Sequence, residues 1–452
     1  MPIHLIVLAA GQGTRMQSDR PKVLHRIGGA PLFAHALAAG AALEPDRTVL
    51  VAGHGADEVG RAAAELDPAI AVVVQHEQKG TAHAVAQAAP ALEGAAGDVL
   101  ILYGDTPLIR PETLERMIAA RAAGHAVVVL GFEAADPGRY GRLVMDGERL
   151  ERIVEFKDAS DQERRITLCN SGVICADVAT LFDLVGAVGD DNAAGEFYLT
   201  DIVELARRRG LSATAVTCPE AETMGVNTRA ELAAAEAEFQ RRARARALDD
   251  GVTLTAPETV FFAHDTVIGR DAIVEPNVVF GPGVTVESGA CIRAFSHLEG
   301  CHLGAGAVVG PFARLRPGAE LSNDVHVGNF VEIKNAILGD GAKVNHLSYI
   351  GDASVGEGTN IGAGTITCNY DGVFKHRTEI GAHAFIGSDT MLVAPVRVGT
   401  GAMTGSGSVI TRDVPDGALA LGRAAQVVKE GFAARLFDRL RARKADLARE
   451  TR

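Results

Sequence analysis

A glycine-rich segment near the start of the chain carries two cations at positions that suit phosphate binding. It reads Gly11-Gln12-Gly13-Thr14-Arg15, and Lys22 follows shortly after. Backbone N–H groups of such a loop at a strand end bind phosphate oxygens, and Arg15 and Lys22 would add positive charge. A Rossmann fingerprint would need Gly at position 16, where Met stands, and a Walker loop needs a Gly-Lys pair that the chain lacks. We expect a phosphate loop of another kind, with a purely structural turn as the alternative.

Oxygen-bearing side chains follow other apolar runs of the N-terminal half. Asp105 comes directly after the run that ends at Tyr103, and Asn227 follows Gly225 and Val226. Carboxylate and amide oxygens beside a phosphate loop suit a hard divalent cation. A cap on a helix is the alternative role for Asp105, and a surface position is the alternative for Lys22.

The C-terminal half contains a candidate general base. His346 stands two residues after the apolar Val344, and Glu332 precedes the apolar Ile333 in the preceding repeat. A histidine oriented by a carboxylate is a good base for deprotonating an amine. Arg316 and Lys334 could clamp a phosphate group. A structural role is the alternative for any single histidine.

Residues 1–227 alternate short apolar runs with alanine-rich helical stretches, which indicates an α/β sheet with its ligands beyond the carboxyl ends of the strands. The predicted strands are His4–Ala9, Thr48–Ala52, Ala71–Gln75, Asp98–Tyr103 and Ala126–Phe132. The predicted helices are Leu32–Ala42, Asp57–Leu66, Thr81–Ala89 and Pro111–Ala123.

Residues 228–250 form helix-favouring sequence with acidic residues early and basic residues late, which matches the helix dipole. We interpret this segment as a helical linker, and its arginines as a solvated helix face.

From residue 268 the chain has an aliphatic residue at nearly every sixth position. The positions are Ile268, Val274, Phe280, Val286, Ile292, Leu298, Leu303, Val309, Leu315, Leu321, Val327, Ile333, Leu338, Val344, Ile350, Val355, Ile361, Ile380, Ile386, Leu392, Val398, Thr404 and Ile410, with short offsets between blocks. This period is typical of a parallel β-helix of hexapeptide repeats, with these side chains pointing inward. The long gap between Ile361 and Ile380 predicts an inserted loop that includes Cys368–Arg377, and such loops are often functional.

The composition excludes several classes of protein. The 452 residues carry a net charge of −13, which argues against a nucleic-acid binder. No apolar run is long enough for a membrane span, and Leu5–Ala10 is better explained as a buried first strand than as a signal peptide. Six cysteines without a Cys-x-x-Cys pair indicate reduced thiols in a cytoplasm.

Taken together, the motifs resemble the signature of sugar-nucleotide pyrophosphorylases. They are Gly13-Thr14-Arg15-Met16, Pro21-Lys22-Val23-Leu24-His25, Gln75, Gly80-Thr81, Tyr103-Gly104-Asp105, Gly141-Arg142, Val154-Glu155, Asn170-Ser171-Gly172 and Gly225-Val226-Asn227. With the hexapeptide repeats, residues 3–430 resemble the family of bifunctional N-acetylglucosamine-1-phosphate uridyltransferases/glucosamine-1-phosphate N-acetyltransferases.

The resemblance implies that UTP and N-acetylglucosamine 1-phosphate react in the N-terminal domain with Mg²⁺ as cofactor. It places Lys22 and Arg15 in the catalytic machinery with Gly13 at the nucleotide phosphates, Gln75 and Thr81 at the uracil, and Asp105 and Asn227 at the metal. It assigns Gly141, Glu155 and Asn170 to the sugar phosphate. Further contacts with the substrates are expected from Leu8, Ala9, Ala10, Gly11, Gly80, Tyr103, Gly104 and Asn227.

The resemblance also implies acetyl transfer from acetyl-CoA to glucosamine 1-phosphate in the C-terminal domain. His346 would be the general base, with Glu332 supporting it. Glucosamine 1-phosphate would be bound by Arg316, Lys334, Tyr349, Asn360 and Lys375. Acetyl-CoA would be bound by Ala363, Asn369, Tyr370, Ser388, Ser406 and Arg423.

The expected fold class is therefore α/β, in three parts. These are a Rossmann-like mixed-sheet nucleotidyltransferase domain (1–227), a helical linker (228–250) and a left-handed parallel β-helix of hexapeptide repeats with a basic tail (251–452). The resemblance implies a cytoplasmic homotrimer that makes UDP-N-acetylglucosamine for peptidoglycan and lipopolysaccharide, with no nucleic-acid or membrane partner. The tail could meet the phosphates of coenzyme A, or its last residues could form a solvated helix.

Two other readings of the sequence stay open. The first is a nucleotidyltransferase with one activity and a structural β-helix, against which the polar residues from Arg316 to Lys375 argue. The second is a scaffold without activity, against which Lys22, Asp105 and Asn227 argue.

Overall fold

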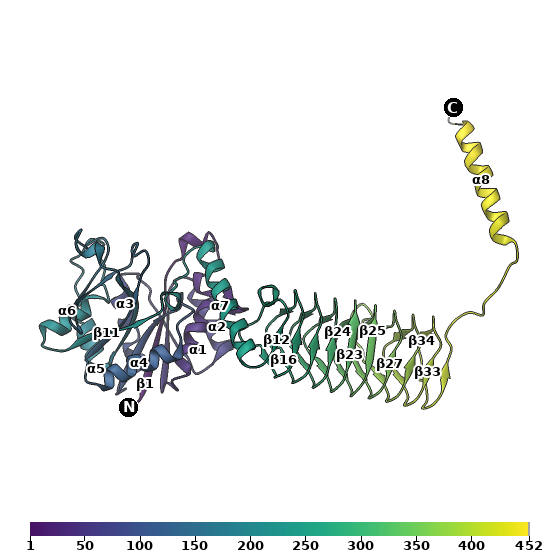
Figure 1. Ribbon diagram of the computed structural model, residues 1–452, viewed down its shortest axis with the longest axis horizontal. Helices are drawn as coiled ribbons and strands as arrows, with labels where there is room; N and C mark the ends of the chain where they lie inside the picture. Colours follow the sequence, from purple (N-terminus) through teal and green to yellow (C-terminus); the bar gives the residue numbers. More distant parts are fainter. Residues whose placement is uncertain (451–452) are drawn as a thin grey trace. The chain divides into compact units, whose positions relative to one another are not determined.

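The computed structural model describes residues 1–450 and divides into two compact units (Figure 1). Unit 1 comprises Met1–Thr285 with His297–Glu299, and unit 2 comprises Val286–Ser296 and the chain from Gly300 onward. Because this division follows spatial contacts, the first repeats belong to unit 1. The domain boundaries at residues 227 and 250 follow the sequence pattern and stay a prediction.

Unit 1 is built on a nine-stranded mixed sheet whose main order is β11-β7-β10-β6-β1-β4-β5. The central strands β1, β4, β5 and β6 are parallel, whereas β10 is antiparallel to both β6 and β7. The strands are β1 (Ile3–Ala9), β4 (Arg47–Ala52), β5 (Ala71–Val74), β6 (Asp98–Tyr103), β7 (Val127–Glu133), β8 (Arg142–Asp146), β9 (Arg149–Val154), β10 (Leu168–Asp177) and β11 (Ala213–Cys218). A small hairpin of β2 (Arg26–Ile27) and β3 (Ala30–Pro31) stands apart. The five predicted strands are confirmed to within a residue at each end.

Helices cover both faces of this sheet, as the alternating pattern predicted. One buried core packs α1 (Leu32–Ala41), α2 (Ala56–Leu66) and α4 (Pro111–Ala122) against the sheet. The other packs α3 (Thr81–Ala86), α5 (Val178–Val185) and α6 (Asp201–Arg208). The predicted helices are confirmed, except that the helix from Thr81 ends at Ala86 and a 3₁₀ turn (Ala89–Leu92) follows, because Pro90 cannot continue an α-helix. The other 3₁₀ turns are η1 (Thr14–Met16), η2 (Lys22–Leu24), η4 (Glu163–Arg165), η5 (Glu220–Glu222) and η6 (Pro257–Thr259).

The predicted linker helix is α7 (Arg229–Asp249). It begins with a capping box in which the Thr228 hydroxyl accepts from the Glu231 N–H and the Glu231 carboxylate accepts from the Thr228 N–H. The same carboxylate accepts from the N–H of Asn227 at 2.7 Å, so the start of the helix fixes the backbone of a candidate metal ligand.

The hexapeptide repeats form a parallel β-helix, as predicted. In unit 1 its strands are β12 (Thr253–Leu254), β13 (Val267–Ile268), β14 (Ile273–Val274), β15 (Val279–Phe280) and β18 (His297–Leu298), and β16 (Thr285–Val286) lies at the boundary. In unit 2 one face stacks β17 (Cys291–Ile292), β20 (Val308–Val309), β23 (His326–Asn329), β25 (Lys343–His346), β27 (Asn360–Ile361), β30 (Phe385–Ile386), β33 (Met403–Thr404) and β35 (Leu419–Ala420).

Two further faces complete each turn of the β-helix in unit 2. One stacks β21 (Arg314–Leu315), β24 (Glu332–Leu338), β26 (Tyr349–Val355), β28 (Ile366–Cys368), β31 (Met391–Val393) and β34 (Val409–Ile410). The other stacks β19 (Cys301–Leu303), β22 (Ala319–Leu321), the second halves of β24 and β26, β29 (Thr378–Ile380) and β32 (Val396–Val398). All the predicted inward positions except Ile268 are buried.

The inserted loop is shorter than the sequence suggested. Thr367 is fully buried and pairs with Leu392 on the next turn, so it takes an inward position that the search for aliphatic residues overlooked. Inside the coil its hydroxyl donates a hydrogen bond to the carbonyl oxygen of Gly351 at 3.0 Å, so this buried polar group has a partner. The loop itself runs from Asn369 to Arg377.

The chain ends in α8 (Phe432–Glu450), whose side chains are solvent-exposed from Phe432 to Leu447. The alternative of a solvated helix at the end of the tail agrees with α8 as far as Glu450, and contact of the tail with coenzyme A stays a prediction. Thr451 and Arg452 lie outside the described residues. Within residues 1–450 no helix is long and apolar enough to cross a membrane. The six cysteines of this range form no disulfide bond.

Candidate active sites

Three side chains from distant parts of the sequence converge at the carboxyl ends of the parallel strands of unit 1. The Lys22 ammonium pairs with the Asp105 carboxylate and donates to the Asn227 side-chain oxygen at 3.0 Å. The N–H of Val226 donates to the Asp105 carbonyl oxygen at 2.9 Å, which holds the two oxygen-bearing loops together. The sequence predicted these three residues, and the structure brings them to one point.

Gly13 makes this convergence possible. Its φ is +64°, and a Cβ at this position would lie 2.5 Å from the Lys22 Cβ. The loop therefore needs both the left-handed backbone and the missing side chain of glycine to pass so close to the lysine.

A cavity of about 310 Å³ opens beside Lys22 and Asp105. Ten of the predicted residues line it: Leu8, Ala9, Ala10, Gly11, Lys22, Gln75, Gly80, Thr81, Tyr103 and Asp105. The buried Gln75 is fixed by hydrogen bonds from its amide nitrogen to the Gly80 carbonyl at 3.1 Å and to His83 Nδ1 at 3.0 Å. Gly104 does not line the cavity, but its N–H donates to the Leu8 carbonyl oxygen near the end of β1 at 2.9 Å.

The sequence analysis missed Gln78 and Glu196, which also line this cavity. Gln78 donates to the carbonyl of Ala10 at 2.7 Å and so fixes the glycine-rich loop. Its signal was a second glutamine just beyond the strand end that carries Gln75. Glu196 lies in a segment without a recognisable pattern. Arg15 is exposed on η1 and does not line the cavity, so its catalytic role stays a prediction.

The residues predicted for the sugar phosphate also lie together. A Cβ at Gly141 would lie 3.5 Å from both the Asn170 Cβ and a Glu155 carboxylate oxygen, and the Asn170 N–H donates to the Gly141 carbonyl. Burial raises the pKa of Glu155, and a hydrogen bond from Thr200 offsets this in part. Burial also raises the pKa of Tyr103, which bonds Thr81 and feels the charges of Asp105 and Glu155. Tyr103 therefore lies between the phosphate-loop cavity and the Glu155 group.

Asp105 and Asn227 have the donor chemistry of a Mg²⁺ site. Both present hard side-chain oxygens to one cation, the Lys22 ammonium. Protein Mg²⁺ sites commonly use one or two such oxygens and leave the other positions to phosphate and water. Among the described residues no group of three or more histidine, cysteine or acidic side chains could hold a metal, so any ion here would share its coordination with a ligand.

In unit 2 the imidazole of His346 is held in one orientation. Its Nδ1 lies 3.0 Å from the Asn329 side-chain oxygen, directly across the ladder between β23 and β25. Because that oxygen can only accept, Nδ1 carries the proton and Nε2 carries the free electron pair. A cavity of about 320 Å³ adjoins the ring.

Glu332 was expected to support His346, but the two residues lie on different faces of the β-helix. Its carboxylate accepts from Arg316 at 2.9 Å and pairs with Arg314 at 3.6 Å. Asn329 contacts the imidazole instead. The sequence could have indicated it, because Asn329 is a polar residue at the matching position of the preceding turn of the β-helix. Within residues 1–450 the structure therefore shows Glu332 bound to arginines and not to His346.

Several residues predicted for glucosamine 1-phosphate gather around Asp352, which the sequence analysis did not single out. This carboxylate lies 3.6 Å from Lys334, accepts from Asn335 at 2.6 Å and hydrogen-bonds Asn369, which also approaches the Tyr349 hydroxyl at 3.5 Å. Burial raises the pKa of Asp352, but the two asparagines and the charges of Lys334 and Lys375 outweigh it and hold the pKa below its usual value. Asn360 lies on another face, paired with Lys343 and Phe385.

Four of the six residues predicted for acetyl-CoA, Ala363, Ser388, Ser406 and Arg423, form a column along one corner of unit 2. The Ala363 carbonyl accepts from the N–H of Asp389 beside Ser388, and the Ser388 carbonyl accepts from Gly407 beside Ser406. The Ser406 carbonyl accepts from the Arg423 guanidinium at 2.7 Å. His346 begins the column, because its carbonyl accepts from Gly364 beside Ala363 at 3.3 Å. Tyr370 is exposed on the inserted loop.

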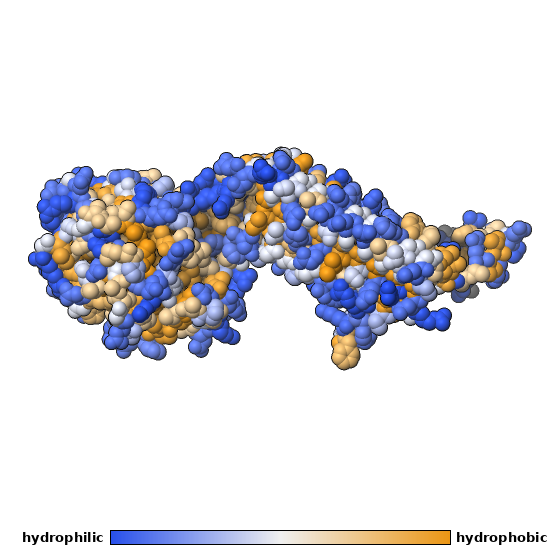
Figure 2. Space-filling view, turned by 90° about the horizontal axis from the view of Figure 1, so that it is seen from below, coloured by the Kyte–Doolittle hydropathy of each residue, from blue (hydrophilic) through white to orange (hydrophobic). Residues whose placement is uncertain are grey.

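The same corner continues on the other side of His346 as a stack of aromatic rings. Phe295, Phe312 and Phe330 stack with centroids 5.0 and 5.3 Å apart, and each side chain is about half exposed. All three, with Leu347 beyond them, adopt positive φ, a conformation that is strained for large side chains. We refer to these four residues as the aromatic ladder. Apolar side chains also reach the surface of the β-helix on the face shown in Figure 2.

Comparisons with known proteins find family models and relatives for both halves of the chain. Residues 5–169 match the family model of the MobA-like NTP transferase domain, and residues 265–300 match that of the bacterial transferase hexapeptide (six repeats). The chain is 74% identical over 440 residues to the bifunctional protein GlmU of Cereibacter sphaeroides, which covers 97% of each chain. It is 68% identical over 445 residues to the protein of that name from Paracoccus denitrificans, covering 98% of this chain and 99% of the relative. It is 66% identical over 441 residues to that of Jannaschia sp., covering 98% and 97%.

Proposed function

Because this chain belongs to the family of bifunctional GlmU proteins, we propose how its residues divide two transferase reactions between two sites. The chain is an enzyme with two activities: it acetylates glucosamine 1-phosphate with acetyl-CoA, and it transfers a uridyl group from UTP to N-acetylglucosamine 1-phosphate. We assign the uridyl transfer to the Lys22 site of unit 1 and the acetyl transfer to the His346 site of unit 2.

In the uridyl transfer, a phosphate oxygen of N-acetylglucosamine 1-phosphate attacks the α-phosphorus of UTP, and pyrophosphate leaves. The reaction needs no protein nucleophile, so the enzyme acts by aligning two anions and stabilising their charge. Lys22 would bind the phosphates, Gln75 the uracil, and Glu155 with Asn170 the sugar. The observation that carries this assignment is the meeting of Lys22, Asp105 and Asn227 beside a cavity lined by the predicted residues.

We propose Mg²⁺ as the cofactor of this site, held by the side-chain oxygens of Asp105 and Asn227. When bound, the ion neutralises charge on the nucleotide phosphates. The Lys22 ammonium now satisfies both oxygens, and it would turn to the phosphates when the ion and nucleotide are present.

In the acetyl transfer, Nε2 of His346 would take a proton from the amino group of glucosamine 1-phosphate. The amine attacks the thioester carbonyl, and the coenzyme A thiol leaves. The corner column supports this assignment, because a ligand lying along Arg423, Ser406, Ser388 and Ala363 would present its far end to His346. A nucleotidyltransferase with one activity would need neither this column nor an imidazole held in one tautomer.

We further propose that the protein is a homotrimer whose copies meet along the β-helix. Asn360 lies on a different face from the Asp352 group, so another copy is needed to bring an Asn360 side chain to that group. The aromatic ladder, which is apolar, exposed and strained, is a surface that a second copy would cover. UTP and acetyl-CoA as co-substrates favour the cytoplasm as the site of action.

Replacing Asp105 by Ala tests the assignment of the two reactions. The variant should lose UDP-N-acetylglucosamine formation from UTP and N-acetylglucosamine 1-phosphate, and it should acetylate glucosamine 1-phosphate at nearly the wild-type rate. Equal losses of both activities in a folded Asp105→Ala protein would contradict it.

A further inference from the structure

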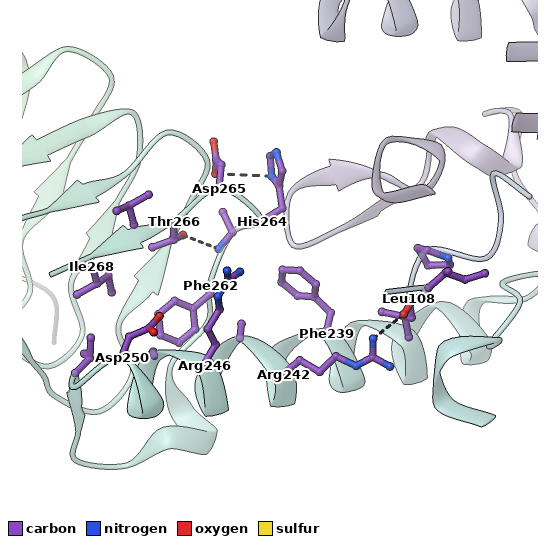
Figure 3. Close-up of a pocket in the computed structure, with 17 residues that line it drawn as sticks. Leu108, Phe239, Arg242, Arg246, Asp250, Phe262, His264, Asp265, Thr266 and Ile268 are labelled. Atoms are coloured by element: carbon purple, nitrogen blue, oxygen red, sulfur yellow. Dashed lines mark hydrogen bonds and ion pairs between the residues drawn. The ribbon is translucent and has the colours of Figure 1, made fainter. Parts of the chain in front are cut away.

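Unit 1 contains a second cavity, of about 520 Å³, that shares no lining residue with the phosphate-loop cavity. It lies between α7, the loop after Asp105 and the first repeats of the β-helix (Figure 3). Its walls come from Pro107–Ile109, from one face of α7 between Phe239 and Asp250, and from Val252 and Phe262–Ile268. A volume of this size is typical of sites for small molecules.

One cation in this cavity has no protein partner. Figure 3 shows Arg246 extending from α7 toward the segment that carries His264 and Thr266. Within residues 1–450 its guanidinium makes no hydrogen bond or ion pair. The neighbouring Arg242 is already engaged by Glu238 at 2.7 Å and by the Leu108 carbonyl at 2.6 Å. Arg246 is therefore the group in the cavity that is available to an anion.

The rest of the wall combines flat apolar surface with acidic groups that limit the charge of a ligand. Phe262 is buried and stacks on Phe280, with ring centroids 5.3 Å apart, so its ring is held rigidly. Phe239 projects from α7 on the opposite side, as Figure 3 shows. Asp265 accepts from the Gly283 N–H at 2.9 Å and lies 3.7 Å from His264 Nδ1, and it and Asp250 place negative charge at the cavity.

We propose that this cavity is a binding site for a small planar molecule with a single anionic group, and that the anion pairs with Arg246 while the ring lies against Phe239 and Phe262. A dianion would meet the charges of Asp250 and Asp265, and an uncharged ring would gain no attraction from the exposed Arg246. The site is distinct from both candidate active sites. Arg242 and Leu108 form part of its wall, so a bound molecule would touch the loop that follows Asp105.

The fluorescent probe 8-anilinonaphthalene-1-sulfonate fits this description, because it carries one sulfonate on fused aromatic rings. Fluorescence titration of the full-length protein should give a site whose dissociation constant rises tenfold or more in Arg246→Glu, since the variant replaces attraction with repulsion. Arg270→Glu is the matched control, because Arg270 is exposed on the neighbouring repeat and does not line the cavity. Its dissociation constant should stay within twofold of wild type.

A second pair of variants tests the place of binding by volume rather than charge. Ala243 lines the cavity and Ala245 faces solvent on the same helix, so Ala243→Phe should abolish this site while Ala245→Phe leaves it intact. All four variants should keep wild-type uridyl transfer, which shows that they fold. Unchanged probe binding in both Arg246→Glu and Ala243→Phe, or equal losses in the variants and their controls, would overturn the proposal.

Discussion

The Asn329 side-chain oxygen lies 3.0 Å from Nδ1 of His346, one turn of the β-helix away. This contact fixes the tautomer in which Nε2 can accept a proton. Replacing Asn329 by Asp puts a carboxylate at the same place and should shift the acidic limb of the acetyl-transfer pH profile to higher pH, because a nearby negative charge favours the imidazolium. Asn329→Ala should lower kcat about tenfold or more without this shift. Identical pH profiles in wild type and Asn329→Asp would show that this contact does not act on the base.

The close approach of Gly13 to Lys22 predicts a strong effect of one methyl group. Gly13→Ala should lower uridyl transfer by about 100-fold, because a Cβ there must push Lys22 away from its partners and displacements near 1 Å are this costly. Gly94→Ala is the control, since Gly94 also has positive φ but has nothing within 4 Å of a new Cβ. Gly94→Ala should transfer uridyl groups at the wild-type rate. A Gly13→Ala protein that reacts as fast as Gly94→Ala would contradict the role of this close contact with Lys22.

Asp352 should act on substrate binding by holding Lys334 and Asn369 in place. Asp352→Asn keeps the size of the side chain but removes the charge that faces Lys334, so the KM for glucosamine 1-phosphate should rise about tenfold with a smaller change in kcat. A fall in kcat with an unchanged KM would place Asp352 in the chemical step instead.

The lowered pKa of Asp352 also sets a pH dependence of stability. A carboxylate whose folded pKa lies below its unfolded value stabilises the fold above the unfolded pKa, and this stabilisation is lost as the pH falls through the folded pKa. Thermal unfolding should therefore show wild type more stable than Asp352→Asn at pH 7, with the difference narrowing below about pH 4. A difference that is constant from pH 7 to pH 3 would contradict the assigned charge state.

The aromatic ladder should be needed for acetyl transfer and for assembly but not for uridyl transfer. Phe330→Lys places a charge in the middle of the stack and should convert the proposed trimer to monomers in light-scattering measurements, with loss of acetyl transfer. Leu66→Lys, at an exposed apolar position of α2, should change neither property. A trimeric Phe330→Lys protein with normal acetyl transfer would show that another surface joins the copies.

The sequence predicted much of the fold because both halves carry strong periodic signals. Five of the nine strands with their intervening helices indicated the α/β sheet, and the aliphatic residue at nearly every sixth position indicated the β-helix. The strands β8 to β11, among them the antiparallel β10, were not predicted. In the β-helix the inward position of Thr367 was missed, because its hydroxyl donates inside the coil to the Gly351 carbonyl, a partner that no sequence pattern shows.

The sequence indicated which site residues lie together where each follows a local motif, and it did not where their contacts depend on the register of the repeats. Lys22, Asp105 and Asn227 each follow a recognisable motif, and strand order alone brings them together. Asn329 and Asp352 act on residues of adjacent turns, and the irregular length of the repeats hides which residues face one another. Glu332 was a plausible partner by spacing, but the corner between β23 and β24 turns it to a different face.

Mixing two inactivated proteins tests most directly whether one chain carries two chemically independent sites. UTP, glucosamine 1-phosphate and acetyl-CoA are supplied to Asp105→Ala, to His346→Ala and to an equimolar mixture of both, and UDP-N-acetylglucosamine is measured. Asp105→Ala alone should stop at N-acetylglucosamine 1-phosphate, and His346→Ala alone should make product about 10²–10⁴-fold more slowly than wild type. The mixture should recover a rate within a few-fold of wild type, because the released intermediate passes from one protein to the other. A mixture no faster than His346→Ala alone, with both proteins folded, would contradict the assignment of the two reactions to separate sites.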